Sequence, residues 1–348
     1  MAFSAGEVAN IANAALDFYL DKGNVFSQTI QARPLFNAMD KAAKTFPGGK
    51  GEVSLAVKGT YTTAVEGYTH SDTVTYANPA NIKRAEYPWK EHHAGISVTH
   101  TELKHDGISV VDGGGGESTS GHSGREATML ANLLEDKLED MAEGYARGMN
   151  TLLYGDGVAT GDVLQGIQHV LPDAPSAAAT TVGGLDCVVN TWWRNRANVA
   201  ITPADLLTFL HTEIRQLRRY GGNPKIAVCG SSFLDQLVTL ITAKGNYTQT
   251  GFAGRGATDI EIADVHYGGI TFKYDPTLDD LTISGQDPKK RCYIIDPSKL
   301  YLSYMTDEKM NRHSPSRPHD SYVMYRAITT TCTLCASQLN CHGIYEIT

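Results

Sequence analysis

The sequence predicts an α+β fold in which projecting strands and one long helix precede a mixed helix-and-strand unit. Strand-forming residues alternate with polar ones from Glu52 to Thr75, the pattern of a two-stranded ribbon that is solvated on at least one side. Apolar residues recur at helical spacing from Arg125 to Tyr154, which predicts a rod of roughly 45 Å at ~1.5 Å per residue. Helix and strand signals then alternate from Thr202 to Met305.

The N-terminal region predicts a helix over 4–22, where Val8, Ile11 and Ala15 recur at helical spacing before Gly23. A short amphipathic piece follows within 24–46. Neither segment is expected to form a core alone. We therefore expect this extension to be either disordered or packed on another surface.

The ribbon that begins at Glu52 is expected to need a partner surface, because isolated two-stranded ribbons are marginally stable. Strand character continues over 82–103, with Trp89 and Ile96 as apolar anchors. A glycine-rich loop at 113–116 separates this strand from the long helix. The expected apolar stripe of that helix consists of Leu130, Leu134, Leu138, Met141, Tyr145 and Met149.

The C-terminal half begins with a well-signalled helix, with Thr202 as its cap, Pro203 in its first turn and Asp205 as the capping-box partner. A loop-rich segment over 158–200 precedes it. The further elements expected are a strand at 225–229, a helix at 231–244, a hairpin at 259–274 and strands at 291–295, 299–305, 321–336 and 338–347.

Bulk composition excludes several classes of protein. A hydrophobic fraction of 41% with 20% charged residues fits a folded chain and argues against wholesale disorder. A net charge of −8 argues against a surface that coats DNA, because such binding needs Lys and Arg on the phosphates. No apolar stretch approaches the ~18 residues that span a bilayer, and no secretory signal peptide is expected. Six cysteines spread over a long chain indicate reduced thiols.

A possible zinc set lies near the C-terminus, where Cys332 and Cys335 are followed by Cys341 and His342. The first two cysteines fall in a strand pattern, in which residues three apart point to opposite faces. Buried strand thiols are therefore favoured over metal ligands. No metal and no cofactor is predicted.

Four histidines form a second candidate cluster: His92, His93, His100 and His105. On a strand, His92 and His100 would share one face, and the other two would share the opposite face. No acidic ligand follows at metal spacing. We expect ordinary surface or interface histidines, which could sense pH if they line a subunit contact.

The remaining patterns do not assemble a catalytic set. The sequence at 230–232 lacks the G-x-S-x-G pattern, so Ser231 is expected to cap a helix. The glycines at 113–116 are not followed by Gly-Lys-Ser/Thr, which argues against a phosphate-binding loop. The basic run 289–291 is expected to be a loop, and the acidic run 135–143 a solvated helix face. No catalytic residue is predicted, and the chain is not expected to be an enzyme.

Three stretches carry a family resemblance: YPWKEHHAGISVT at 87–99, HYGGITFKYDP at 266–276 and QLNCHGIYEI at 338–347. With the order of arm, ribbon, long helix, mixed unit and closing strands, they resemble the Hong Kong 97 (HK97)-type major capsid proteins of tailed double-stranded DNA bacteriophages. The resemblance covers nearly the whole chain as an ordered pattern. It implies the HK97-like capsid fold and a shell-forming subunit.

The resemblance also implies a division of the chain. The N-terminal arm is expected at 1–46 and an extended E-loop hairpin at 47–88. The peripheral domain with its long spine helix is expected at 89–154. A mixed α/β axial domain with connecting strands is expected at 155–310, and closing strands of the peripheral domain at 311–348.

The implied partner is above all the chain itself, in pentamers and hexamers of an icosahedral shell assembled in the bacterial host cytoplasm and found in the virion. The shell would enclose double-stranded DNA, contacted non-specifically on the inside. No charged helical segment precedes the arm, so a separate scaffolding protein is expected, with a portal and an open question over a decoration protein. Some family members cross-link through an E-loop lysine; Lys58 lies in the ribbon, but nothing assigns it that role.

Three alternatives stay open. An encapsulin, the shell of a bacterial compartment, has the same fold and differs in its contents. A metal-dependent enzyme or hydrolase would bind stoichiometric zinc and lose it when Cys332 and Cys335 are mutated. A tail or portal protein would form tubes or rings in electron micrographs.

Overall fold

The computed structural model describes residues 3–4, 33–48, 50–61, 63–76, 81–105, 110–111, 124–157, 161–243, 265–283, 286–313 and 323–348. In the helix that begins at Gly124, side chains are described from Lys137 onward, Glu139 excepted. The helix predicted over 4–22 and the glycine loop at 113–116 lie outside the described residues. Within these ranges no helix is long and apolar enough to cross a membrane.

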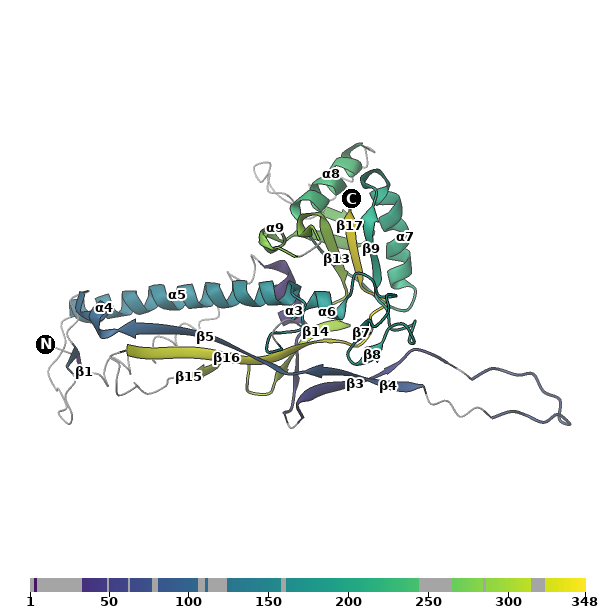
Figure 1. The fold of residues 1–348 in the computed structure, drawn as a ribbon, viewed down its shortest axis with the longest axis horizontal. Coiled ribbons are helices and arrows are strands. Elements are labelled where there is room, and N and C mark those ends of the chain that lie inside the picture. The colour runs from purple at the N-terminus through teal and green to yellow at the C-terminus, as the bar shows by residue number, and fades with distance from the viewer. Residues whose placement is uncertain are drawn as a thin grey trace.

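The molecule has an elongated lower part, a second unit above one end of it, and a hairpin that projects beyond that end (Figure 1). The lower part consists of the long helix α5 (Gly124–Tyr154) running alongside two long strands, β5 (Lys90–Thr99) and β16 (Val323–Ala336). The projecting hairpin is formed by β3 (Glu52–Lys58) and β4 (Ile82–Pro88).

The lower part, which we call the body, is built on a five-stranded sheet. Strand β16 is its centre: it pairs with β5 from Val323↔Thr99 to Cys332↔Lys90. The helix predicted over 125–154 is present, and Leu138, Met141, Tyr145 and Met149 of its predicted stripe are buried. The other strands are β15 (Asn311–His313) and β14 (Leu300–Met305), which both pair with β16, and β2 (Lys44–Phe46), which pairs with β14.

Part of the predicted N-terminal arm belongs to this body. Helix α3 (Pro34–Lys41) starts with proline in its first turn and buries Leu35, Phe36 and Met39 completely in the core. Strand β2 then joins the sheet in parallel with β14. The extension was expected to be disordered or packed on another surface. Over 33–46 it is neither, because these residues belong to the chain's own core and sheet.

The upper unit is a six-stranded sheet with helices α7 (Leu206–Arg218) and α8 (Ser231–Ala243) beside it (Figure 1). An apolar cluster lies on the face of this sheet that α7 and α8 cover, with Leu210, Phe233 and Phe272 fully buried. The opposite face, with Val228, Tyr293 and Ile344, packs into the core of the body. The strand order is β11 (Val265–Tyr267), β12 (Ile270–Tyr274), β10 (Ile226–Cys229), β13 (Arg291–Ile295), β17 (Gly343–Ile347) and β9 (Arg196–Ile201). The last strand of the chain thus lies in the upper unit, whereas β14 lies in the body.

Several local predictions were wrong. Among its described residues, the ribbon expected over Glu52–Thr75 is a strand only at Glu52–Lys58, and the strand expected at 338–347 begins at Gly343. The strand expected over 82–103 ends at Thr99, and α4 (His100–His105) follows. The cause is a capping box: the Thr99 backbone N–H donates to Glu102 Oε2 at 2.9 Å, and the Glu102 N–H donates to Thr99 Oγ1 at 3.2 Å. Thr202 makes no side-chain cap, because Pro203–Asp205 form a 3₁₀ turn and α7 begins only at Leu206.

The remaining elements of the described ranges are short. They are β1 (Phe3–Ser4), β6 (Val110–Val111), α6 (Ile167–Val170), β7 (Thr181–Val182), β8 (Leu185–Asp186), α9 (Pro276–Asp280) and the 3₁₀ turn η3 (Pro288–Lys290).

Candidate subunit-contact surfaces

The base of the projecting hairpin is anchored to the body. Seven residue pairs join β3 to β4 antiparallel, from Glu52↔Pro88 to Lys58↔Ile82. The face turned to the body buries Val53, Val57 and Tyr87. Tyr87 donates its hydroxyl to the carbonyl of Ala336 at 3.0 Å, and burial raises the pKa of this phenol far above its ordinary value. The base therefore has a fixed position.

The remainder of the hairpin, residues 59–76, exposes large apolar side chains. Tyr61 is 81% exposed, Tyr68 70% and Tyr76 90%, and Val65 is fully exposed. We call these four residues the tip residues. The same segment has a turn in which the Thr69 backbone N–H and hydroxyl both donate to Asp72. An exposed apolar surface of this kind marks an interaction site.

A cleft of about 650 Å³ lies where the hairpin meets the upper unit. Trp192 forms one wall and lies against Gly59, where a Cβ atom would overlap the indole ring. Lys58 and Arg219 also line the cleft, and each stacks on a neighbouring tyrosine ring. The cleft is therefore lined by aromatic rings and by cationic side chains that lie over them.

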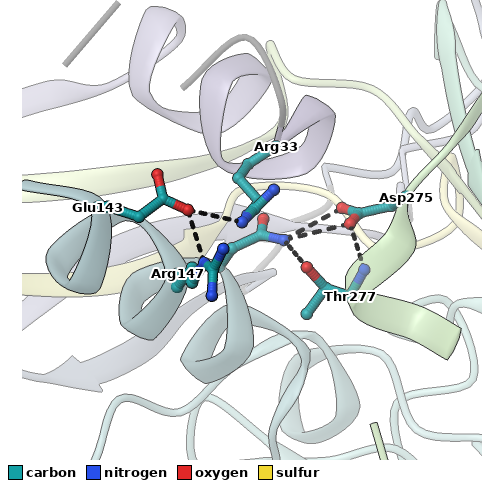
Figure 2. Close-up of polar contacts among 6 residues, drawn as sticks. Arg33, Glu143, Arg147, Asp275 and Thr277 are labelled. Atoms are coloured by element: carbon teal, nitrogen blue, oxygen red, sulfur yellow. Dashed lines mark hydrogen bonds and ion pairs between the residues drawn. The ribbon is translucent and has the colours of Figure 1, made fainter. Parts of the chain in front are cut away.

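A buried polar cluster joins the long helix, α3 and the upper unit (Figure 2). Asn150 of α5 donates to Asp275 Oδ2 at 3.1 Å and to Thr277 Oγ1 at 2.8 Å, and its Oδ1 accepts from the Phe36 backbone N–H at 3.2 Å. Tyr154 also donates to Asp275 Oδ2, at 2.9 Å. Asp275 and Asn150 are completely buried. We call this cluster the joint, because three elements distant in sequence meet there.

An ion-pair network lies beside the joint, on the more exposed side of the same helix. Glu143 Oε1 accepts from Arg33 Nη2 at 3.1 Å and from Arg147 Nε at 2.6 Å (Figure 2). Arg33 immediately precedes α3, so this network and Asn150 both hold α3 against α5. Because Glu143 keeps a third of its side chain exposed, the completely buried joint contributes more to this attachment than the Arg33–Glu143 pair.

Comparison with known proteins identifies the family. The family model for the SU10 major capsid protein matches residues 51–348, which is most of the chain. The chain belongs to the SU10 major capsid protein family. No curated protein matches the sequence.

Solved capsid structures share the fold of this capsid protein. The cyanophage A-1(L) capsid asymmetric unit matches with a TM-score of 0.59 at 14% identity, covering 90% of this chain and 92% of that one. Gordonia phage Cozz matches with a TM-score of 0.51 at 11% identity, covering 89% and 86%. The capsid of a native GTA particle matches with a TM-score of 0.51 at 14% identity, covering 89% and 90%. At these identities the likeness shows the fold alone. The family match confirms the predicted bacteriophage major capsid protein, a subunit of an icosahedral head.

In this capsid protein the suspected zinc residues are not brought to one place that could hold a metal. Cys332 and Cys335 are buried on β16, and burial raises the pKa of each thiol to about 12. Cys335 accepts from Ser303, whereas Cys341 contacts His342 Nε2 at 3.4 Å. Among the described side chains, no three His, Cys, Asp or Glu residues cluster as metal ligands would.

The four histidines are split between two elements. His92 and His93 lie on β5, and His100 and His105 begin and end α4, so the shared strand faces predicted for them do not exist. His92 is half-buried, and burial lowers its pKa. His93 and His105 are exposed, and His100 is buried.

The remaining candidates have structural partners. Ser231 donates its backbone N–H and its hydroxyl to Asp279 Oδ1, at 3.1 and 3.0 Å, at the start of α8. Arg291 of the basic run is fully buried and pairs with Asp173 at 2.7 Å and Glu346 at 2.6 Å. Lys58 ends β3 and lies over the Tyr61 ring.

Sequence reasoning did not find the joint or the cleft. Asn150 and Asp275 are 125 positions apart, and each is an ordinary polar residue in its own segment. The Asp275-Pro276 pair is a signal for the start of a helix, and α9 does start there, but this signal does not name Asn150 as a partner. The contact between Gly59 and Trp192 likewise joins residues that are far apart in the sequence.

Proposed function

We propose that this capsid protein assembles into pentamers and hexamers that close an icosahedral head around double-stranded DNA in the cytoplasm of the bacterial host. Residues 47–88 are the E-loop and α5 is the spine helix of the peripheral domain. The upper unit is the axial domain, which gathers around the axis of each capsomer. The protein acts as a structural subunit and catalyses no reaction.

The observation that carries this proposal is the contrast between the hairpin's base and its tip. The base is fixed by buried residues and by the Tyr87 hydrogen bond. The tip residues extend beyond the body with their apolar groups in solvent. A surface that is held out by a rigid base gains order and buries apolar area only when a second molecule covers it. In the head, that molecule is a neighbouring copy of the same chain.

A shell also needs one subunit to fit both five-fold and six-fold surroundings. The upper unit has its own apolar cluster on one face of its sheet, whereas the other face packs into the core of the body, where Tyr154 of the joint contacts Tyr293. Small rotations at their boundary would let the upper unit adapt to either ring while the body keeps its shape. Many modest contacts per subunit would then add up to a stable closed particle.

The charge of the chain fits a container for DNA. At a net charge of −8, an inner wall that is neutral or acidic on average would let DNA slide during packaging, because phosphates are not held by excess Lys or Arg. A separate scaffolding protein, a portal and a decoration protein are the further partners of this proposal.

The test is electron microscopy of the expressed protein, alone and with a candidate scaffolding protein from the same genome. The proposal expects closed icosahedral heads, or pentamers and hexamers when the scaffold is missing. Rings or tubes alone would contradict it, as would a protein that stays monomeric in both conditions.

A further inference from the structure

Two cysteines face each other at the centre of the upper unit. Cys229 of β10 and Cys292 of β13 are directly opposite in the antiparallel register. Their sulfur atoms lie 3.1 Å apart, and both residues are completely buried. None of the contacts described for the capsid role uses this pair.

The backbone holds the pair in the geometry that a cross-strand disulfide needs. The next pair along the ladder is a hydrogen-bonded one, because the Gly230 N–H donates to the Arg291 carbonyl at 3.0 Å. Hydrogen-bonded and non-hydrogen-bonded pairs alternate in an antiparallel ladder, so Cys229 and Cys292 form a non-hydrogen-bonded pair. Such pairs have Cα atoms about 4.5 Å apart, within the roughly 4.4–6.8 Å that disulfides span.

We propose that Cys229 and Cys292 form an oxidation site, at which a peroxide closes a disulfide between the two central strands of the upper unit. One thiol is oxidised by hydrogen peroxide to a sulfenic acid, which releases one water. The sulfur of the second thiol attacks that sulfenic sulfur, forms the S–S bond and expels the hydroxyl group as a second water. In total, two thiols and one peroxide give one disulfide and two waters.

The other four cysteines provide an internal contrast. Cys332 and Cys335 lie three residues apart on one strand, which separates their Cα atoms by roughly 10 Å, beyond the ~7 Å limit for a disulfide. Cys341 contacts a histidine, and Cys187 lies near the carbonyl of Leu185. All six cysteines are buried, so burial does not distinguish among them. The Cys229–Cys292 pair is distinguished by the short distance between its two sulfur atoms.

Burial also sets the conditions of the reaction. Burial, followed by the hydrogen bond from Cys229, raises the pKa of Cys292 well above its ordinary value, so little thiolate is available. The pair therefore remains reduced in a reducing cytoplasm and closes slowly in a particle exposed to peroxide outside the cell. Closure would fix β10 to β13 covalently in the head.

The test is to expose the full-length protein to hydrogen peroxide, remove the peroxide, unfold the protein in the presence of iodoacetamide and count alkylated cysteines by mass spectrometry. We expect the count to fall from six to four, with a peptide pair linked through Cys229 and Cys292. Dithiothreitol should restore the count of six. The Cys292→Ala variant should show no linked pair, and Cys332→Ala should still show it.

A parallel set of samples in urea, below the unfolding midpoint, lets the sheet open locally and gives the oxidant access. Six alkylated cysteines in this set as well would overturn the proposal. So would sulfinic acid at Cys229 or Cys292 without a linked pair, or linkage of either residue to another cysteine. These readouts on the unmodified chain decide the matter even if a variant fails to fold.

Discussion

The body strand β16 and the tip of the hairpin have similar residue types and opposite surroundings. From Thr330 to Ala336, β16 is buried on both faces, because α6 and β4 contact it and Tyr145 of α5 hydrogen-bonds to Thr330. Both β16 and the segment 59–76 are rich in the β-branched residues Thr and Val, yet the segment 59–76 and its tip residues lie in solvent. Residue type therefore does not distinguish a region that stabilises the subunit from one that we propose to join subunits. What distinguishes them is whether the chain's own layers cover the region.

Truncation of one aromatic ring in each region should affect stability very differently. Phe36→Ala removes a fully buried ring from the body and should lower the free energy of unfolding by about 3–5 kcal/mol. Tyr61→Ala, in the tip, should change it by less than about 0.5 kcal/mol. Denaturant unfolding of the unassembled protein measures both. A small loss of unfolding free energy in the Phe36→Ala variant would show that the packing of α3 contributes little to stability.

Acid should act on the buried regions through His342. Burial lowers the pKa of this fully buried imidazole to about 4, below its ordinary value of 6.5, and its Nδ1 accepts from the Asp296 N–H. The neutral form is the one that the fold stabilises. Its contribution, on the order of 3 kcal/mol, is therefore complete above pH 6.5 and is lost as the pH falls toward 4.

Unfolding experiments between pH 7.5 and pH 4 measure this loss. His342→Asn should remove most of the slope, whereas His70→Asn, a substitution of an exposed residue in the tip, should leave it unchanged. An unchanged slope in the His342 variant would refute this assignment.

Asn150→Ala tests whether the joint contributes to the stability of the body. The substitution leaves the Phe36 N–H and part of the buried Asp275 carboxylate without a partner, at a cost of about 2 kcal/mol. Thr151→Ala, one residue along the same helix and exposed, is the matched control and should have almost no effect. Equal effects of the two substitutions on the denaturation midpoint would be evidence against the joint.

A smaller effect is expected where the hairpin meets the upper unit. Gly59→Ala displaces Trp192, so tryptophan emission should move to longer wavelength and stability should fall by about 1 kcal/mol. Gly67→Ala is the control, because a Cβ at Gly67 would contact nothing within 4 Å. An unaltered spectrum for the Gly59 variant would mean that Trp192 does not need this contact.

The sequence indicated elements with local signals and missed those that depend on distant contacts. Helical spacing predicted a helix at 125–154, and the structure has Gly124–Tyr154. The run at 291–295 is a strand with the predicted bounds, since an apolar run between turn residues is a local feature. The burial of α3 was not predicted, because one amphipathic turn does not show which surface will cover it. The 99–102 capping box was local, but strand character on its N-terminal side concealed it.

For the candidate site, the sequence predicted a hairpin but not its division into an anchored base and an exposed tip. Alternation predicted a two-stranded ribbon over Glu52–Thr75, but within the described part of that range only Glu52–Lys58 is a strand, and its partner is β4 at Ile82–Pro88. Which part is anchored depends on Tyr87 reaching Ala336, 249 positions away. The zinc hypothesis failed for the opposite reason. Its cysteines and histidine are close in the sequence, but the structure does not bring them together as metal ligands.

The central claim is that the tip residues serve assembly and not folding. The most direct measurement compares the wild-type protein with a Tyr61→Ser, Tyr68→Ser and Tyr76→Ser triple variant, by thermal unfolding of the unassembled subunit and by electron microscopy under head-forming conditions. Our account predicts unfolding temperatures that agree within about 2 °C and a loss of closed heads in the variant. Normal heads from the variant, or a subunit that no longer folds, would contradict it.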